Sequence, residues 1–418
     1  MNIARPIYLQ KLIDRKQNGM IKVITGMRRC GKSFLLFSIF REHLKQSGVD
    51  DDHIIAVDLE DRRNKDFRNP DTLLDFIDKK MSGNDVYYIL IDEVQMAAEF
   101  EDVLNSLLKR SNADVYVTGS NAKFLSKDVI TEFRGRGDEV RIRPLSFAEF
   151  HSTNPQADRT AALTEYMAYG GLPQTVSMKS PSQKEDYLKD LFLHTYLVDI
   201  KERYRIRNDE DLEELVRVVA SSIGGLTNTT KLQNTFNSEK KSKISNATIK
   251  SYLDMLQDAF LVEKSTRYDI KGRKYIGTQS KYFFEDLGVR NAVINFRQSE
   301  KSHLMENMIY NELRMRGYSV DVGQVTVNTK DSSGASKRKY FEVDFVCNSG
   351  FKRYYIQSAL ELSTKDKIEQ ELRSLQNIND SFQKMVIVGG AAPTYQNENG
   401  IIIMNVFDFL LGDSKLFV

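Results

Sequence analysis

Apolar and polar positions alternate regularly over the first part of the chain. Its short apolar segments, rich in β-branched and aromatic residues, are typical of buried strands. Between some of them, residues 72–80 and 100–110 repeat apolar positions every three or four residues, as amphipathic helices do. This alternation predicts an α/β domain over residues 1–150, in which helices cover a parallel sheet. The expected strands are 20–24, 54–59, 87–91, 115–118 and 139–142.

The pattern becomes mostly helical after residue 150. The last of the expected helices is followed by two apolar segments, 260–262 and 282–284, with a basic connection between them. Helices followed by a two-stranded ribbon predict a winged helix-turn-helix, within a second domain of residues 151–295. The expected helices are 160–169, 184–203, 212–223 and 248–257.

Strand and helix patterns alternate again in residues 296–418, which predicts a third, mixed α/β domain. Within it, the polar residues 327–339 are turn-forming, so we expect a mobile hairpin loop there. Three domains agree with the length of 418 residues, because a single hydrophobic core rarely grows to that size.

Composition narrows the classes of protein only slightly. Lys and Arg number 60 against 58 Asp and Glu, so the net charge is +2 and any surface for nucleic acid must be local. The two cysteines, Cys30 and Cys347, lie in no metal-ligand spacing, which favours a reducing compartment and a cytoplasmic location. No apolar stretch approaches the roughly 20 residues that span a bilayer, so we expect no membrane partner.

The strongest chemical signal is the run GMRRCGKS, which lies between an expected strand and an expected helix. It fits the phosphate-binding P-loop in full. The glycines let backbone N–H groups turn toward phosphate, Lys32 reaches the β and γ phosphates, and Ser33 can ligate Mg²⁺. The alternative, a chance match in a glycine turn, is disfavoured by the strand and helix on either side. We expect ATP to be bound by Gly26, Met27, Arg28, Arg29, Cys30, Gly31, Lys32, Ser33 and Phe34.

Two carboxylates, Asp92 and Glu93, follow the apolar segment YYILI at the edge where a parallel sheet binds its ligand. Asp92 is suited to hold the Mg²⁺ shell, and Glu93 to position and polarise the attacking water. The alternative is a pair of solvated acids at a strand end. Together with the P-loop, these residues predict an enzyme that hydrolyses ATP to ADP and phosphate with Mg²⁺.

Two further groups carry weaker signals. Ser120 and Asn121 end a neighbouring strand, and we name Asn121 as a sensor of the γ-phosphate, although an N-cap for the next helix explains both residues nearly as well. Arg134 and Arg136 follow, and an arginine supplied by a neighbouring subunit could stabilise charge on the transferred phosphoryl group. We favour Arg136 over the alternative of a surface arginine in a turn; this role implies a homo-oligomer.

The runs GMRRCGKS, YYILIDEVQ, VYVTGSNAKFLS, RGR, PLSFAEF and YGGLP resemble a family of prokaryotic AAA-type ATPases. The resemblance covers essentially the whole chain. It implies a P-loop ATPase module followed by a winged-helix region and by a carboxy-terminal domain of unknown function that is related to restriction-endonuclease folds. It implies nucleotide hydrolysis and says little about a substrate.

Nucleases of that fold use an acid on one strand and an acid-x-Lys triplet on the next to bind Mg²⁺ and activate water. Glu342 and Asp344 supply the first acid, with Glu306 as a candidate helical partner. However, Gln357 and Ala359 stand where the second acid and the lysine should be. We therefore expect a domain that has lost cleavage and serves binding.

The winged helix offers a local basic surface for DNA. Helix 248–257, with Lys250, would be the recognition helix, although a solvated hairpin used for protein contact is an equal alternative. We expect a Mg²⁺-dependent AAA-type ATPase whose nucleotide state controls a partner, with DNA as the first hypothesis. A nucleotide-gated protein scaffold with slow turnover is the alternative, and an ATP-dependent nuclease ranks last. The wing residues are Lys264, Arg267, Lys271, Arg273 and Lys274.

Overall fold

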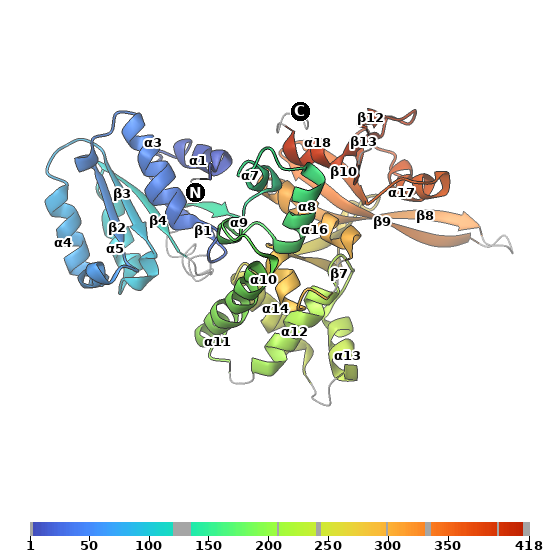
Figure 1. Ribbon diagram of the computed structural model, residues 1–418, viewed down its shortest axis with the longest axis horizontal. Helices are drawn as coiled ribbons and strands as arrows, with labels where there is room; N and C mark the ends of the chain where they lie inside the picture. The colour runs from blue at the N-terminus through green and yellow to red at the C-terminus, as the bar shows by residue number, and fades with distance from the viewer. Residues whose placement is uncertain are drawn as a thin grey trace. The chain divides into compact units, whose positions relative to one another are not determined.

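The computed structural model of the chain forms two compact units. The first contains Met1–Pro144 with Asp258–Phe260, and the second contains Leu145–Gln257 and Leu261–Val418 (Figure 1). The predicted boundary at residue 295/296 lies within the second unit, and the three-domain division stays a prediction. The structure describes residues 3–119, 135–206, 209–239, 244–297, 300–330, 336–390 and 393–412.

The first unit contains a five-stranded sheet in which every described pairing is parallel, as the alternating pattern predicted. Its strand order is β2-β3-β4-β1-β5, so β1 lies between β4 and β5. Parallel strands bring their carboxyl ends to one edge, which places the segments after β1, β3 and β4 side by side. The strands are β1 (Ile21–Gly26), β2 (Ile54–Asp58), β3 (Tyr87–Asp92), β4 (Ala113–Thr118) and β5 (Gly137–Ile142).

Helices connect these strands, and their ends carry the expected signals. The helix α4 begins where the Asn69 side chain accepts the N–H of Thr72, with Pro70 in its first turn. The helix after the P-loop runs through α2, a π-helical segment η1 and α3 without a break. The helices are α1 (Pro6–Ile13), α2 (Lys32–Phe34), η1 (Leu35–Phe40), α3 (Arg41–Gln46), η2 (Asp51–His53), η3 (Arg62–Arg68), α4 (Pro70–Lys80), η4 (Val94–Met96) and α5 (Phe100–Leu108).

The second unit contains an eight-stranded mixed sheet with the order β12-β13-β11-β10-β9-β8-β6-β7. The ribbon predicted as a wing is the hairpin β6–β7, and β6 also pairs in parallel with β8. The ribbon is therefore continuous with the strands that follow residue 296, which the sequence pattern did not indicate. The strands are β6 (Val262–Asp269), β7 (Lys274–Phe284), β8 (Ser319–Lys330), β9 (Ser336–Ser349), β10 (Lys352–Ala359), β11 (Gln383–Val388), β12 (Tyr395–Gln396) and β13 (Ile402–Asn405).

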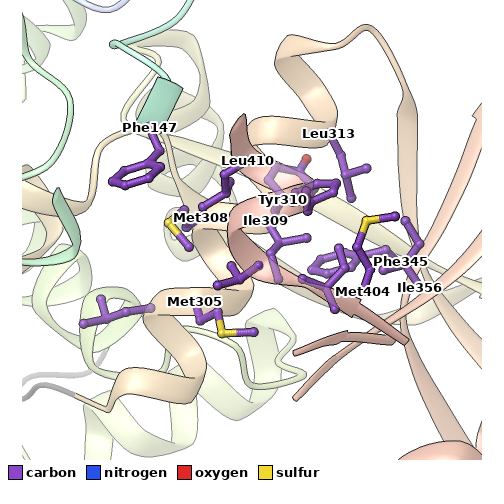
Figure 2. Close-up of a cluster of buried hydrophobic side chains, with 14 of the residues drawn as sticks. Phe147, Met305, Met308, Ile309, Tyr310, Leu313, Phe345, Ile356, Met404 and Leu410 are labelled. Atoms are coloured by element: carbon purple, nitrogen blue, oxygen red, sulfur yellow. The ribbon is translucent and has the colours of Figure 1, made fainter. Parts of the chain in front are cut away.

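The helix α16 (Lys301–Met315) forms the centre of the main core of the second unit. Its apolar side chains Met308 and Ile309 pack among side chains of the sheet, including Phe345 and Ile356 (Figure 2). A second apolar cluster gathers residues of α17 (Lys365–Gln376) with other side chains of the same strands. The sheet is thus buried by helices on both faces.

The remaining helices of the second unit precede or follow the sheet along the chain, except α15, which lies between β7 and β8. One of them, α13, occupies a segment for which the sequence pattern predicted no helix. It lies between α12 and α14, so three helices precede the β6–β7 hairpin. These helices are α7 (Phe147–His151), α8 (Arg159–Tyr169), α9 (Pro173–Val176), α10 (Pro181–Leu191), η6 (Phe192–Leu197), α11 (Val198–Tyr204), α12 (Asp209–Ser221), α13 (Thr229–Glu239), α14 (Asn246–Asp258), α15 (Leu287–Val293) and α18 (Val406–Leu411).

The loop predicted over residues 327–339 is largely replaced by strand. β8 continues to Lys330 and β9 begins at Ser336. The hairpin is present, but the predicted loop was too long at both ends because the two strands satisfy each other's backbone groups there, which local turn propensity does not reveal. Residues 331–335 lie outside the described residues. None of the described helices combines the length and the apolar character that a bilayer crossing requires.

Candidate functional site

The P-loop joins the carboxyl end of β1 to α2, and its backbone conformation depends on glycine. Gly26 has a φ of 140° and Gly31 a φ of 99°. A Cβ added at Gly26 would lie 2.1 Å from the carbonyl oxygen of Ile142, so no larger residue fits without moving β5. The loop therefore passes directly against the last residue of β5.

Lys32 is held inside this loop. Its ammonium donates to the carbonyl oxygens of Gly26 and Met27, both at 3.1 Å, and its side chain is buried. These acceptors are neutral, so the ammonium can exchange them for phosphate oxygens without leaving a buried carboxylate unpaired. Met27 and Cys30 are themselves buried, and any contact they make with phosphate would use their backbone.

The other predicted nucleotide residues line the outer side of the loop. Arg28, Gly31 and Phe34 are half-buried, and Arg29 and Ser33 are exposed. Arg29 has a φ of 66°, a left-handed conformation that non-glycine residues adopt rarely and that often marks functional turns.

Asp92 ends β3 and is buried beside the start of the P-loop helix. Its carboxylate accepts a hydrogen bond from the Thr118 hydroxyl, and the Ser33 hydroxyl lies near it. Burial raises the pKa of Asp92 to about 6, with the two hydroxyls lowering it and the nearby carboxylates of Glu93 and Asp58 raising it. The two predicted Mg²⁺ ligands, Ser33 and Asp92, thus lie close enough for the hydroxyl to lower the pKa of the carboxyl, and both offer the hard oxygen donors that Mg²⁺ prefers.

Glu93 follows in a left-handed conformation, with a φ of 49°. Its backbone N–H donates to the Thr118 hydroxyl at 3.0 Å, and its carboxylate accepts a hydrogen bond from the Gln95 side-chain amide. Thr118 therefore connects the two acids: it donates to Asp92 and accepts from Glu93.

Sequence reasoning missed three residues of this site: Thr118, Gln95 and Asp58. Asp58 ends β2, and its Cα is the register partner of Asp92 across the sheet. Each had a signal, because Thr118 and Asp58 stand at the carboxyl ends of expected strands and Gln95 closes the run DEVQ.

Arg136 lies at the opposite edge of the sheet from its own P-loop. It precedes β5 and is exposed, and its carbonyl oxygen accepts the N–H of Ile21 at the start of β1. The length of β1, about 17 Å, separates that position from Gly26. If the Arg136 side chain contacts a γ-phosphate, that phosphate must therefore be bound by a neighbouring copy of the chain. Ser120, Asn121 and Arg134 lie outside the described residues.

Arg5 connects the P-loop to the end of β5. This buried guanidinium donates to the carbonyl oxygens of Cys30 at 3.0 Å and Arg143 at 2.6 Å. The N–H of Arg143 in turn donates to the Tyr8 hydroxyl at 3.1 Å. The residues just before Pro144, where the first unit ends, are thus fixed to the phosphate-binding loop.

The second unit assembles the acids that the nuclease resemblance singled out, around a lysine that it did not. Lys281 of β7 is buried, and its ammonium lies 2.7 Å from Glu306 Oε1, 2.7 Å from Glu342 Oε1 and 3.9 Å from Asp344 Oδ1. Burial alone would lower the pKa of Lys281, but the three carboxylates outweigh it and raise that pKa. Burial raises the pKa values of Glu306 and Asp344, against the effect of the ammonium.

Gln357 occupies the position of the expected second acid. Its side-chain oxygen is 3.4 Å from the backbone nitrogen of Asp344. β9 bulges at this point, since its register with β8 shifts between Asp321 and Gly323. Ala359 is buried. Among the described residues, no set of three or more His, Cys, Asp or Glu has a geometry that could hold a metal ion.

Comparisons with known proteins agree with the geometry of the first unit. Residues 18–151 match a family described as an AAA domain, and residues 160–300 match one described as a domain of unknown function (DUF8612). The first unit is thus an AAA-type P-loop ATPase domain.

An uncharacterized protein of Haemophilus influenzae is 35% identical over 414 residues, which make up 98% of each chain. The chain therefore belongs to the family of AAA-domain proteins that includes this relative. An uncharacterized protein of Methanocaldococcus jannaschii is 29% identical over 375 residues, 87% of this chain and 79% of its own.

Two solved structures are distantly similar to this chain. The Aeropyrum pernix ORC1 protein in complex with DNA is 13% identical, with a TM-score of 0.29 over 70% of this chain and 92% of that one. Cdc6p from Pyrobaculum aerophilum is 11% identical, with a TM-score of 0.29 over 73% of this chain and 97% of that one. Likenesses this distant carry no argument about function.

Proposed function

We propose that this chain is a Mg²⁺-dependent ATPase and that the nucleotide state of its first unit controls how the second unit engages DNA. The observation that carries the ATPase proposal is the connection of Asp92 and Glu93 through Thr118, beside the P-loop residues Lys32 and Ser33. A phosphate-binding ammonium, an oxygen pair for Mg²⁺ and a candidate base occupy one edge of one sheet.

Each residue has a separate task in this proposal. Lys32 exchanges loop carbonyl oxygens for phosphate oxygens, and Ser33 with Asp92 would hold Mg²⁺, which neutralises charge on the phosphates when bound. Glu93 leaves the Gln95 amide and accepts a hydrogen bond from the attacking water. Arg136, exposed at the far edge, supplies charge to the site of a neighbouring copy in a homo-oligomer.

The test is steady-state phosphate release with ATP and Mg²⁺. Glu93→Gln keeps the shape of the side chain but removes its basicity, and we expect turnover to fall by about 10²–10⁴-fold while ATP binding is retained. Glu99→Gln, an exposed change six positions further along, is the matched control and should leave turnover unchanged. Equal turnover of wild type and Glu93→Gln would show that Glu93 is not the base of the reaction.

The Gln95 contact favours a second candidate function. The Gln95 amide occupies one oxygen of the Glu93 carboxylate and so competes with an attacking water, as expected of a nucleotide-gated scaffold with slow turnover. In the same assay, two equally inactive proteins that both bind ATP would make the scaffold the better description.

DNA is the proposed partner because the second unit has local basic surfaces. Lys271, Arg273 and Lys274 are exposed around the β6–β7 turn, and Lys250 is exposed on α14. Three helices followed by a hairpin support the winged-helix interpretation. Phosphate release measured with and without duplex DNA separates the partners: stimulation supports DNA, and turnover that ignores DNA points to a protein.

A further inference from the structure

The strands β8 and β9 extend well past the ends of the neighbouring strands in their sheet. β6 pairs with β8 only at Val322–Gln324, and β10 pairs with β9 only over Phe345–Ser349. Further out, residues 325–330 and 336–341 pair with each other, and the described pairings give them no other neighbour. We name these two segments the distal arm. Figure 1 shows it projecting past α17 within the second unit.

The distal arm is anchored at its base and exposed beyond it. Val325 is buried in the cluster beneath α17, and Val327 packs against that cluster. From Ser336 to Tyr340 every side chain is exposed, with Tyr340 56% exposed. A two-stranded ribbon alone is at best marginally stable in water, so an exposed extension adds little to folding. Its surface chemistry therefore points to a partner.

The exposed part of the arm is strongly cationic. Lys337, Arg338 and Lys339 are consecutive, and the sequence has no acidic residue at positions 322–330 or 336–341. Their register partners on β8 are Thr329, Asn328 and Val327, none of which is an ionisable residue type. In a chain with a net charge of only +2, this is a local concentration of charge.

The charge lies on both faces of the ribbon. Successive side chains of a strand point to opposite faces, so Lys337 and Lys339 share one face, about 7 Å apart, while Arg338 and Tyr340 share the other. A flat anionic membrane would meet the cations of one face only. A DNA groove has phosphates along both walls, and the major groove is wide enough for a two-stranded ribbon.

We propose that the distal arm is a second DNA-contacting surface, in which Lys337, Arg338 and Lys339 bind backbone phosphates of the duplex. The proposal rests on the proposed function, because it assumes that DNA is the partner. The arm differs from the β6–β7 turn, where the carboxylate of Asp269 accepts the N–H of Gly272 among the cations. The two surfaces can therefore be tested by separate substitutions.

The experiment measures binding of a fluorescently labelled duplex by anisotropy over a range of salt concentrations. The arm variant combines Lys337→Glu, Arg338→Glu and Lys339→Glu. Its control, with the same change in charge, combines three exposed lysines of the first unit: Lys79→Glu, Lys80→Glu and Lys109→Glu. A third protein carries Arg273→Glu in the wing. Thermal unfolding, and ATP turnover without DNA, verify that each protein is folded.

The expected result is weaker binding by the arm variant. The slope of log affinity against log salt is negative, and its magnitude should fall by about 3, one for each phosphate that the arm no longer binds. The control should keep the wild-type slope. If the arm variant binds like wild type while Arg273→Glu weakens binding, the arm proposal is wrong and DNA remains the partner. If wild type binds no duplex, the proposed DNA partner fails first. Arm-dependent binding to anionic vesicles or an acidic peptide without duplex binding would also overturn the arm proposal.

Discussion

Two buried lysines, Lys32 of the first unit and Lys281 of the second, are held by opposite kinds of partner. In the P-loop, Lys32 bonds to neutral carbonyl oxygens and Asp92 bonds to hydroxyl groups, so neither charge neutralises the other. In the second unit, Lys281 lies directly between Glu306 and Glu342, and the charges satisfy one another.

The difference between neutral and charged partners indicates which group of charges is arranged to bind a ligand. Neutral partners can be exchanged for phosphate and Mg²⁺ at little cost, because no charge is left unpaired. An ammonium within a buried acid cluster cannot be given up in that way, since the carboxylates would then lack a counter-charge. This contrast is the reason why we propose the chemistry for the first unit and a binding role for the second.

The strongest test of this contrast removes Lys281. We expect Lys281→Met to lower the free energy of unfolding by about 3–5 kcal/mol, because it leaves Glu306, Glu342 and Asp344 without a counter-charge. The loss should be smaller at acidic pH. Burial already raises the pKa values of Glu306 and Asp344, and a raised acid pKa favours the folded state below the titration range and loses that contribution as pH rises through it.

Urea unfolding at several pH values measures this loss. Lys274→Met, an exposed change on the same strand, is the control and should cost little. Lys32→Ala should behave in the opposite way to Lys281→Met: we expect it to lose ATP binding and to change the free energy of unfolding only slightly. A stable Lys281→Met protein at alkaline pH would contradict the interpretation.

Asp286 shows a third way of holding a buried carboxylate, by hydrogen bonds from backbone N–H groups. It accepts the backbone N–H groups of Gly171 at 2.7 Å and Val289 at 2.9 Å, and burial raises its pKa to about 6 although backbone hydrogen bonds lower it. It also explains the YGGLP run, because a Cβ added at Gly170 would lie 2.2 Å from its carboxylate.

Because the folded pKa of Asp286 lies above its ordinary value near 4, its contribution to stability is complete below about pH 4 and is lost as pH rises to about 6. Wild type should therefore lose about 2 kcal/mol relative to Asp286→Asn between pH 4 and pH 7, since the unfolded carboxyl is already partly ionised at pH 4. Urea unfolding of both proteins gives this difference. The exposed change Asp366→Asn should give none. A difference that does not vary with pH would mean that Asp286 is not titrating in this range.

Sequence patterns predicted the first unit well because its signals are local. A buried parallel strand, the glycines of the P-loop and the acids at a strand end each lie within a few residues, and the five strands lie close to their expected positions. The second unit was predicted less completely, since its organisation depends on contacts between distant residues. The pairing of β6 with β8 and the meeting of Lys281 with Glu306 have no local signature.

The same reasoning explains what was missed in the site itself. Thr118 is the last residue of an expected strand, whereas the sequence prediction named the polar residues after it, Ser120 and Asn121, as candidates to contact a phosphate. That Thr118 contacts both Asp92 and Glu93 depends on β3 and β4 being neighbours, which follows from the strand order and not from either strand alone.

A final prediction therefore concerns Thr118, and it tests whether hydroxyl partners prepare Asp92 for Mg²⁺. Thr118→Val keeps the shape but removes the donor to Asp92 and the acceptor of the Glu93 N–H. A hydrogen bond to a charged group is worth about 1.5–3 kcal/mol, so we expect the Mg²⁺ concentration for half-maximal turnover to rise by about 10- to 100-fold. Nucleotide binding without Mg²⁺ should change little, because Lys32 is untouched. Thr118→Ser restores the hydroxyl and should recover the wild-type Mg²⁺ dependence. If valine and serine variants both respond to Mg²⁺ like wild type, Asp92 is positioned by its burial alone, and the contrast between exchangeable and self-satisfied charges must rest on Lys32 and Lys281.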